Sequence, residues 1–326
     1  MTIKEMIKAL PGASTIINQI TGIEFWKDKR FFYGNSVASN KNTANQLEYK
    51  LLTELHKLEK GFGATNQRPF GVTKVKTVIR LLDSNKIPKE SYAHKLAESM
   101  LVSYKELYEE NQWTELDQYK KVCDYIDRNP CRKTIGYGAK NVAASSLKTI
   151  NIVEYASFLS RRHSTRSFSG EKVSDVEIKK AIDAAILSPS ACNRQPCKVY
   201  HIKKRKNISS LKAILPGFNL FDTDNMTLLV VTFDMSFALF VGERNQGWFN
   251  SGLFSMNLVN ALHAEDIGTC FLQWGERFSI EKKVKRQLGI PDSERIAVVI
   301  ACGHYKNRIN ILHSARRPTD EIYRTD

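Results

Sequence analysis

The sequence of 326 residues has few of the features that mark fibrous, exported or membrane proteins. Its 17 glycines and 9 prolines exclude a collagen-like or low-complexity composition. The longest apolar stretch, residues 226–241, is interrupted by Asp234 and is too short to cross a bilayer as a helix. No apolar signal-peptide core precedes Pro11. Six cysteines without a CxxC pair do not form the scaffold of a small secreted domain, so we expect a cytoplasmic protein without membrane association.

The motifs of several enzyme classes are also missing from the sequence. There is no HExxH, and the seven histidines show no other zinc-site spacing. There is no GxSxG nucleophile elbow, no P-loop and no GxGxxG. These absences argue against a zinc hydrolase, a serine hydrolase of that type and a Rossmann dinucleotide-binding domain. No metal site is predicted.

The charge is strongly positive but evenly spread. Lys and Arg number 49 and Asp and Glu 34, for a net charge of +15. We count 24 basic and 16 acidic residues in 1–150, and 25 and 18 in 151–326, which leaves +8 and +7. A basic chain favours anionic partners. Because no basic tail or arm concentrates the charge, we expect a small anionic ligand rather than nucleic acid or a membrane surface.

Residues 1–150 are predicted to form a mostly helical extension. Leucines recur every three or four residues from Leu47 to Leu58, which is the pattern of one buried helical face, and Gly61 provides a stop. The expected helices are 45–60, 89–110 and 115–128.

Residues 151–326 are predicted to form an α+β domain. Ser174 and Glu177 make a capping box before a helix with one apolar face. Helix 246–264 is apolar on more than one face, which is typical of a core centre or a dimer interface. The expected strands are 198–202, 226–233, 269–274 and 296–302, and a further helix is expected at 279–288. Strands that alternate with helices predict a mixed sheet flanked by helices.

Two segments at the ends of the Ser174 helix could bind a cofactor. Residues 161–168 (RRHSTRSF) place three arginines, His163 and two hydroxyls close together, and such groups donate hydrogen bonds to phosphate. Residues 188–196 (SPSACNRQP) form a turn-like run of small and amide residues before a strand. This run can offer hydrogen bonds to a planar polar ring.

Together these segments resemble the opening of the nitroreductase-type FMN-dependent oxidoreductase family. Residues 250–271 resemble the long central dimer helix of that family and the strand after it, although Glu265-Asp266-Ile267 replaces the usual apolar and glycine turn. Residues 296–304 resemble its late core strand, and Arg316-Arg317-Pro318 resembles its closing basic motif. The resemblance covers about residues 152–326, and four motifs in the same order and spacing make it specific.

The resemblance implies a set of cofactor-binding residues. Arg162, His163, Ser164 and Arg166 would hold the FMN phosphate and ribityl chain, and Arg316 and Arg317 would close on the same phosphate. Pro189, Ser190 and Asn193 would contact the isoalloxazine ring from the other subunit. Asn219 would hydrogen-bond the flavin, and Leu272, Gln273 and Trp274 would lie beside its reactive face and N5. Trp274 is equally compatible with a packed aromatic side chain. No catalytic side chain is predicted, because the flavin carries the chemistry.

The implied activity is FMN-dependent oxidoreduction in a homodimer with two flavin sites at its interface. Hydride would pass from NADH or NADPH through flavin N5 to a small organic acceptor in a ping-pong reaction. One alternative is an FMN-dependent dehydrogenase or oxidase that reduces dioxygen and modifies a sugar-linked or peptide metabolite. Residues 56–61 (HKLEKG) resemble a stretch in proteins with such a domain behind a helical extension, some of them associated with polysaccharide biosynthesis, although a solvated helix end explains them better. The other alternative is a redox-silent basic binding protein.

Overall fold

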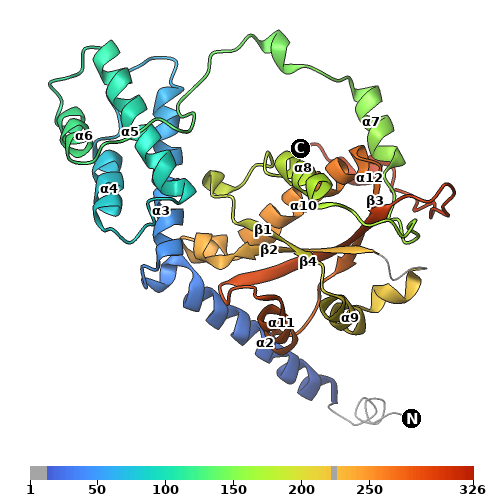
Figure 1. The fold of residues 1–326 in the computed structure, drawn as a ribbon. Coiled ribbons are helices and arrows are strands. Elements are labelled where there is room, and N and C mark those ends of the chain that lie inside the picture. Colours follow the sequence, from blue (N-terminus) through green and yellow to red (C-terminus); the bar gives the residue numbers. More distant parts are fainter. Residues whose placement is uncertain (1–12, 222–225) are drawn as a thin grey trace.

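The computed structural model describes residues 13–221 and 226–326, which form a helical region followed by an α+β domain with helices on both faces of its sheet (Figure 1). The described part of the helical region has five long helices, α2 (Ala13–Asn35), α3 (Ala44–Phe62), α4 (Val72–Asp83), α5 (Tyr92–Glu110) and α6 (Asp117–Arg128), and two 3-10 turns, η1 (Val37–Ser39) and η2 (Ala144–Leu147). The three expected helices are confirmed as α3, α5 and α6, whereas α2 and α4 were not predicted.

The α+β domain contains the four expected strands in the expected order. The strands are β1 (Cys197–Ile202), β2 (Thr227–Asp234), β3 (Ile267–Gln273) and β4 (Glu294–His304). Its helices are α7 (Ile152–Arg161), α8 (Asp175–Ala185), α9 (Arg205–Ile214), α10 (Gln246–Ala264), α11 (Phe278–Leu288) and α12 (Thr319–Ile322). The 3-10 turns are η3 (Ala191–Asn193), η4 (Pro216–Leu220), η5 (Met235–Phe237) and η6 (Val241–Glu243). The Ser174 capping box is present at the start of α8. None of the described helices is both long and apolar enough to span a bilayer.

The sheet has the order β1-β2-β4-β3, and each neighbouring pair of strands is antiparallel. The four strands thus form an antiparallel sheet, and a parallel pairing occurs in the isolated bridge between Ser164, outside the strands, and Thr269 of β3. Every residue of β2 is buried, because successive side chains point to opposite faces and both faces are covered. Leu229 and Val231 pack in one apolar cluster with α8 and α10. Leu228 and Val230 pack in another with α9 and α11.

The helical region shares an apolar core with the α+β domain. Leu51, Leu55 and Leu58 of α3 are fully buried in a cluster that also contains Phe233 and Phe237, from the end of β2 and from η5. Burial of such a side chain stabilises the fold by about 1.5–3 kcal/mol. The two parts of the chain are therefore joined by packing as well as by the connecting segment.

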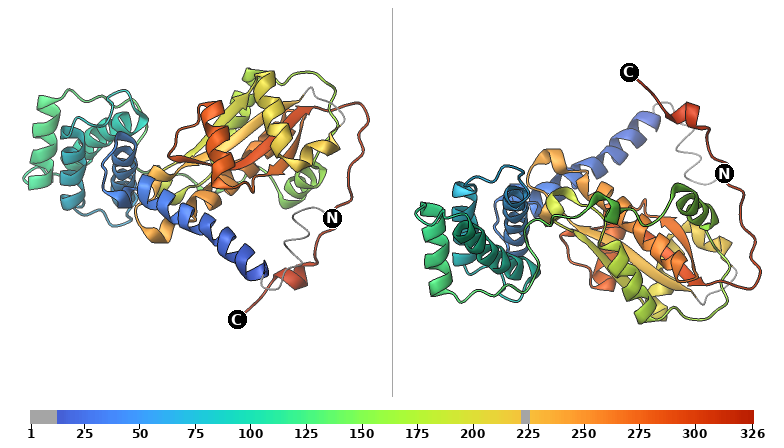
Figure 2. Two further views of the ribbon diagram at one scale, coloured as in Figure 1. Left: turned by 90° about the horizontal axis from the view of Figure 1, so that it is seen from below. Right: turned by 90° about the horizontal axis from the view of Figure 1, so that it is seen from above.

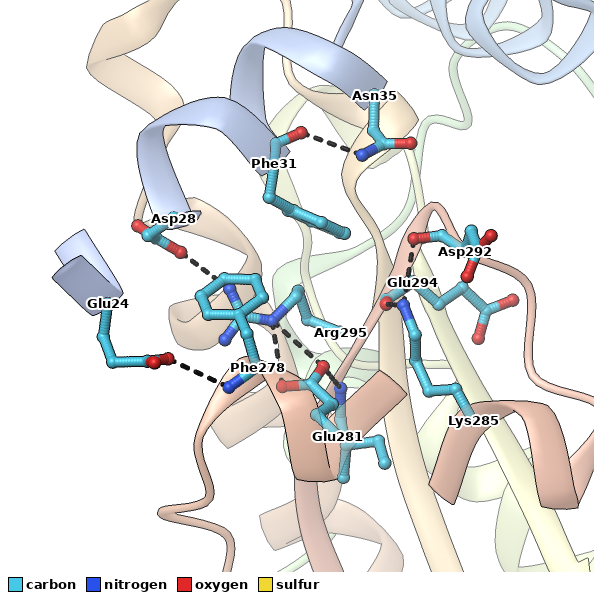
Figure 3. A network of polar contacts seen from close by, with 11 residues as sticks. Glu24, Asp28, Phe31, Asn35, Phe278, Glu281, Lys285, Asp292, Glu294 and Arg295 are labelled. Carbon is cyan, nitrogen blue, oxygen red and sulfur yellow. Dashed lines mark hydrogen bonds and ion pairs between the residues drawn. The ribbon is translucent and has the colours of Figure 1, made fainter. Parts of the chain in front are cut away.

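Helix α2 is held against the α+β domain by a buried arginine of β4 (Figure 3). Arg295 Nε donates to Glu281 Oε1 of α11 at 3.0 Å, and its Nη1 lies 2.6 Å from Asp28 Oδ1 of α2. The guanidinium also lies 4.0 Å from the ring centroid of Phe278 and 5.2 Å from that of Phe31. Such cation–π contacts add to the ion pairs. This network fixes α2 along α11.

The residues after β4 run along the surface and then leave the body of the protein (Figure 2). Residues 310–326, including the short helix α12, are exposed. This part of the chain therefore has little to hold it in place within one molecule.

Candidate functional site

The basic segment 161–168 lies along the outer edge of the sheet. Thr165 N donates to Thr269 O at 2.8 Å, and Phe168 forms an antiparallel bridge with Tyr305. Gly303 permits this close approach, since a Cβ at that position would lie 2.7 to 3.0 Å from atoms of the Phe168 side chain. The segment is thus attached to β3 and to the end of β4 by backbone bonds.

The arginines of this segment have no carboxylate partner within the part of the chain that the structure describes. Among the described residues, neither Arg162 nor Arg166 forms an ion pair, and Arg166 Nη1 donates only to the Ser164 carbonyl at 3.4 Å. Burial raises the pKa of Cys270 in β3, and the charges of Arg166 and Arg162 oppose that rise. Burial and then Arg162 lower the pKa of His263 in α10. Uncompensated cations this close together form a site that attracts an anion.

The structure brings the end of β3 and the turn η4 close to each other. Leu272 and Trp274 are buried in the same apolar cluster as Phe218 of η4. Gln273 and Asn219 are exposed. The buried Trp274 Nε1 has no hydrogen-bond partner in the described part of the chain, so Trp274 is a packed aromatic side chain whose donor is unsatisfied there.

The turn with Pro189, Ser190 and Asn193 lies before β1, the strand at the other edge of the sheet. Cys192, Asn193 and Gln195 have φ angles of 51°, 48° and 50°. This left-handed conformation is uncommon in residues other than glycine. Ser190 Oγ accepts a hydrogen bond from Gln195 N at 2.9 Å and closes the turn.

A buried arginine that the sequence analysis did not single out anchors this turn. The Arg194 side chain is inaccessible to solvent, and its Nη1 and Nη2 donate to the two carboxylate oxygens of Glu243 at 2.8 and 2.6 Å. Nη1 also donates to the Phe237 carbonyl at 2.6 Å, and the guanidinium lies 5.1 Å from the Phe237 ring centroid. The bidentate pair holds the turn against η6, and the bond to the Phe237 carbonyl holds it against η5. No sequence signal pointed to Arg194, because Glu243 is 49 residues away.

The predicted cofactor residues thus form two groups at opposite edges of one sheet. Strands are about 4.8 Å apart, so the edges of a four-stranded sheet are separated by roughly 14 Å. Arg162, His163, Ser164 and Arg166 are at the β3 edge, and the turn is at the β1 edge. Arg316 and Arg317 join neither group, because they lie on the exposed C-terminal segment, where Arg317 pairs with Glu321 at 3.3 Å.

A cavity of about 390 Å³, which we call the junction pocket, lies between the turn and the helical region. Pro189 and Ser190 line it from the turn, and Asn45, Glu48 and Tyr49 line it from α3. The sequence analysis did not single out these α3 residues. Their spacing of i, i+3 and i+4, with Leu52 at i+7, is the available signal, since it places them on one helix face. The described residues contain no cluster of three His, Cys, Asp or Glu side chains that could hold a metal.

Comparison with known proteins identifies the α+β domain. Residues 159–304 match the model of the Nitroreductase family. They form a nitroreductase-family domain. The match confirms the expected family over residues 159–304, and with it the expected oxidoreductase class.

The same part of the chain is similar to individual proteins of that kind. A protein of Archaeoglobus fulgidus named "Putative NADH dehydrogenase/NAD(P)H nitroreductase" is 25% identical over 165 residues, which are 50% of this chain and 92% of that protein. The structure of a Nitroreductase Family Protein from Streptococcus pneumoniae covers 53% of this chain and 100% of its own, with 23% identity and a TM-score of 0.44. An FMN-dependent Nitroreductase from Clostridium difficile covers 52% and 98%, with 18% identity and a TM-score of 0.43.

Proposed function

We propose that the protein is an FMN-dependent oxidoreductase that uses NADH or NADPH to reduce a small organic molecule. Bound FMN would supply the chemistry, by taking up a hydride from the nicotinamide and passing it on to the acceptor. The chain itself would bind and orient both reactants. The observation that carries this proposal is that neither Arg162 nor Arg166 forms an ion pair with any of the described residues.

The residues of the basic segment fit the phosphate of FMN. A phosphate monoester carries nearly two negative charges at neutral pH. Arg162 and Arg166 offer two guanidinium groups that no carboxylate of the described residues neutralises. Ser164 and His163 add further polar groups next to them. Arginine suits this task because its planar fork can bind two oxygens at once. The bridge between Ser164 and Thr269 attaches the segment to β3, the strand that also carries Leu272 and Gln273.

We further propose that the active form is a homodimer. A flavin that contacts both edges of the sheet needs the β3 edge of one chain and the β1 edge of another. Helix α10 offers an interface, since Phe249 is 62% exposed and Trp248 and Met256 are 37% exposed. Large patches of exposed apolar side chains are rare on the surfaces of monomeric proteins and mark interaction sites. Two such chains would form two flavin sites.

The C-terminal segment could bring Arg316 and Arg317 to a flavin phosphate in such a dimer. The twelve residues from His304 to Arg316 can span about 40 Å when extended. We propose that this segment closes over the bound cofactor, with Asn219 of η4 at its edge. All six cysteines are free thiols, which supports a cytoplasmic location.

The phosphate assignment is tested with the double variant Arg162→Ala/Arg166→Ala. Each hydrogen bond to a charged group contributes about 1.5–3 kcal/mol, and 1.4 kcal/mol corresponds to a tenfold change in affinity. We expect FMN to bind at least about 100-fold more weakly, as measured by quenching of flavin fluorescence. Arg132→Ala, which removes an exposed arginine of the helical region, is the control. Equal affinities of the double variant and the wild type would refute the assignment.

The dimer is tested with Phe249→Asp, followed by light scattering after gel filtration. A charge in an apolar interface should convert the dimer to a monomer and release FMN. Phe25→Asp is the matched control, because Phe25 is an 80% exposed phenylalanine on α2 and not on the proposed interface helix. A monomeric wild type that retains FMN, or a dimeric Phe249→Asp, would contradict the proposed arrangement.

A further inference from the structure

The junction pocket is built from both parts of the chain and has no role in the proposed flavin site. Helix α3 supplies Asn45 and Glu48 from the helical region, and the turn supplies Pro189 and Ser190. Its volume of about 390 Å³ is within the range of small-molecule sites. The helical region, for which the sequence analysis found no task, thus forms one wall of a cavity beside the proposed flavin turn.

The charge of the pocket is opposite to that of the protein. The carboxylates of Glu48, Asp234 and Glu294 line it, and so do the cations Arg194 and Lys198. Arg194 is already neutralised by its bidentate pair with Glu243. Three carboxylates therefore line the pocket against one remaining cation, the ammonium group of Lys198, in a chain whose net charge is +15. This charge pattern repels phosphates and carboxylates and attracts cations.

One of the three carboxylates has no partner. Asp234 accepts hydrogen bonds from Asn45 and from Ser236 N, and Glu294 accepts from the hydroxyls of Tyr200 and Thr232. Glu48 forms no hydrogen bond or ion pair within the described part of the chain.

The surroundings of the Glu48 carboxyl shift its pKa. Burial raises this pKa above its ordinary value, the positive charge of Lys198 opposes the rise, and the negative charge of Asp234 adds to it. A partly buried carboxylate without a partner is costly, and a bound cation would remove that cost.

A second unsatisfied group lines the same pocket. Asn250 of α10 is 2% exposed, and its Oδ1 accepts a hydrogen bond from Gln246 at 3.1 Å. Its amide nitrogen has no hydrogen-bond partner among residues 13–221 and 226–326. Buried polar groups in native proteins are almost always paired, so a lone donor here calls for an acceptor atom. Leu52, Ile186 and Phe254 supply apolar wall between the polar groups.

We propose that the junction pocket binds the organic acceptor, and that this acceptor carries a protonated amine, held by Glu48, and a carbonyl or hydroxyl oxygen, held by Asn250. This inference rests on the proposed function, because Pro189 and Ser190 line the pocket and are proposed to contact the flavin ring. The helical region then determines which organic acceptor reaches the flavin.

The proposal is tested by calorimetric titration of the full chain, loaded with FMN, with three small probes. 4-(Aminomethyl)benzamide has an ammonium group and a carbonyl oxygen, 4-methylbenzamide lacks the ammonium group, and benzylamine lacks the oxygen. We expect 4-(aminomethyl)benzamide to bind at least tenfold more tightly than 4-methylbenzamide and severalfold more tightly than benzylamine. Glu48→Gln should abolish the tenfold preference. Glu110→Gln, at the exposed end of α5, should retain it.

The outcomes separate this inference from the proposed function. If the protein retains FMN but binds none of the probes, or binds them equally, the inference is wrong and the flavin function stands. Unchanged binding by Glu48→Gln also overturns it, and this substitution removes no contact that the fold needs. If the purified protein takes up no FMN yet shows the charge preference and its loss in Glu48→Gln, the cation site stands and the flavin function fails.

Discussion

The buried pair of Arg194 and Glu243 allows the sharpest prediction, because it fixes the turn that carries Pro189, Ser190 and Asn193. Two hydrogen bonds of 2.8 and 2.6 Å join the guanidinium to the carboxylate. The Arg194 side chain is fully buried and that of Glu243 is 14% exposed. Removing one partner of a buried pair leaves an uncompensated charge and costs about 3–5 kcal/mol. We expect Arg194→Met to lose that much of the free energy of unfolding, out of about 5–15 kcal/mol for a typical domain.

The loss should depend on pH in a defined direction. Burial acts to raise the pKa of Glu243, but hydrogen bonds from Arg194 and from Leu239 N outweigh it, and the pKa lies below its ordinary value. A carboxyl whose pKa is lower in the folded than in the unfolded state stabilises the fold above its unfolded pKa. That contribution is lost as the pH falls through the folded pKa. The difference in free energy of unfolding between wild type and Arg194→Met should therefore have its full size at pH 7. It should shrink as the pH falls below 4.5, the ordinary pKa of a glutamate.

Denaturant unfolding followed by circular dichroism at several pH values measures this difference. Arg244→Met is the control, because Arg244 is exposed one residue after Glu243. It should change the free energy of unfolding by less than about 0.5 kcal/mol. If Arg194→Met were within about 1 kcal/mol of the wild type at pH 7, the pair would not anchor the turn and the reasoning would be refuted.

Two further predictions concern the packing around the sheet. Glu281→Gln should lower the free energy of unfolding by about 3 kcal/mol, because it leaves Arg295 buried without its main partner. Asp28→Asn should cost less than about 1 kcal/mol, since the Asp28 side chain is 50% exposed and solvent screens the pair; equal losses in the two variants would contradict this ranking. Gly303→Ala should cost about 1–3 kcal/mol, because its Cβ would meet the Phe168 side chain. An unchanged melting temperature would show that the basic segment is not packed there.

The helices whose signals lie in the local sequence pattern were predicted well. The helix expected at 246–264 is α10 with the same bounds, and the Ser174 capping box begins α8 as expected. Helix α2 was missed because its sequence has no single apolar face. Phe25 and Trp26 on it are exposed, and its attachment depends on Arg295 in β4, which local pattern does not reveal.

Some features of the candidate site can also be recognised in local sequence, whereas others depend on residues far apart in the chain. The basic segment 161–168 could be recognised because its cations are close in sequence. Their attachment to Thr269, more than a hundred residues later, could not be predicted from periodicity. Arg194 and Glu48 escaped notice because their environments depend on distant elements. Asn45 on the same helix hydrogen-bonds Asp234, 189 residues away.

The central claim is that this chain binds FMN and reduces it with a nicotinamide. The most direct measurement is the flavin content and absorbance of the purified protein, desalted after incubation with FMN and then titrated anaerobically with NADH or NADPH. The account predicts about one FMN per chain and loss of the oxidised flavin absorbance with at least one of the two nicotinamides. A colourless protein that does not retain FMN, or bound flavin that neither nicotinamide bleaches, would contradict it.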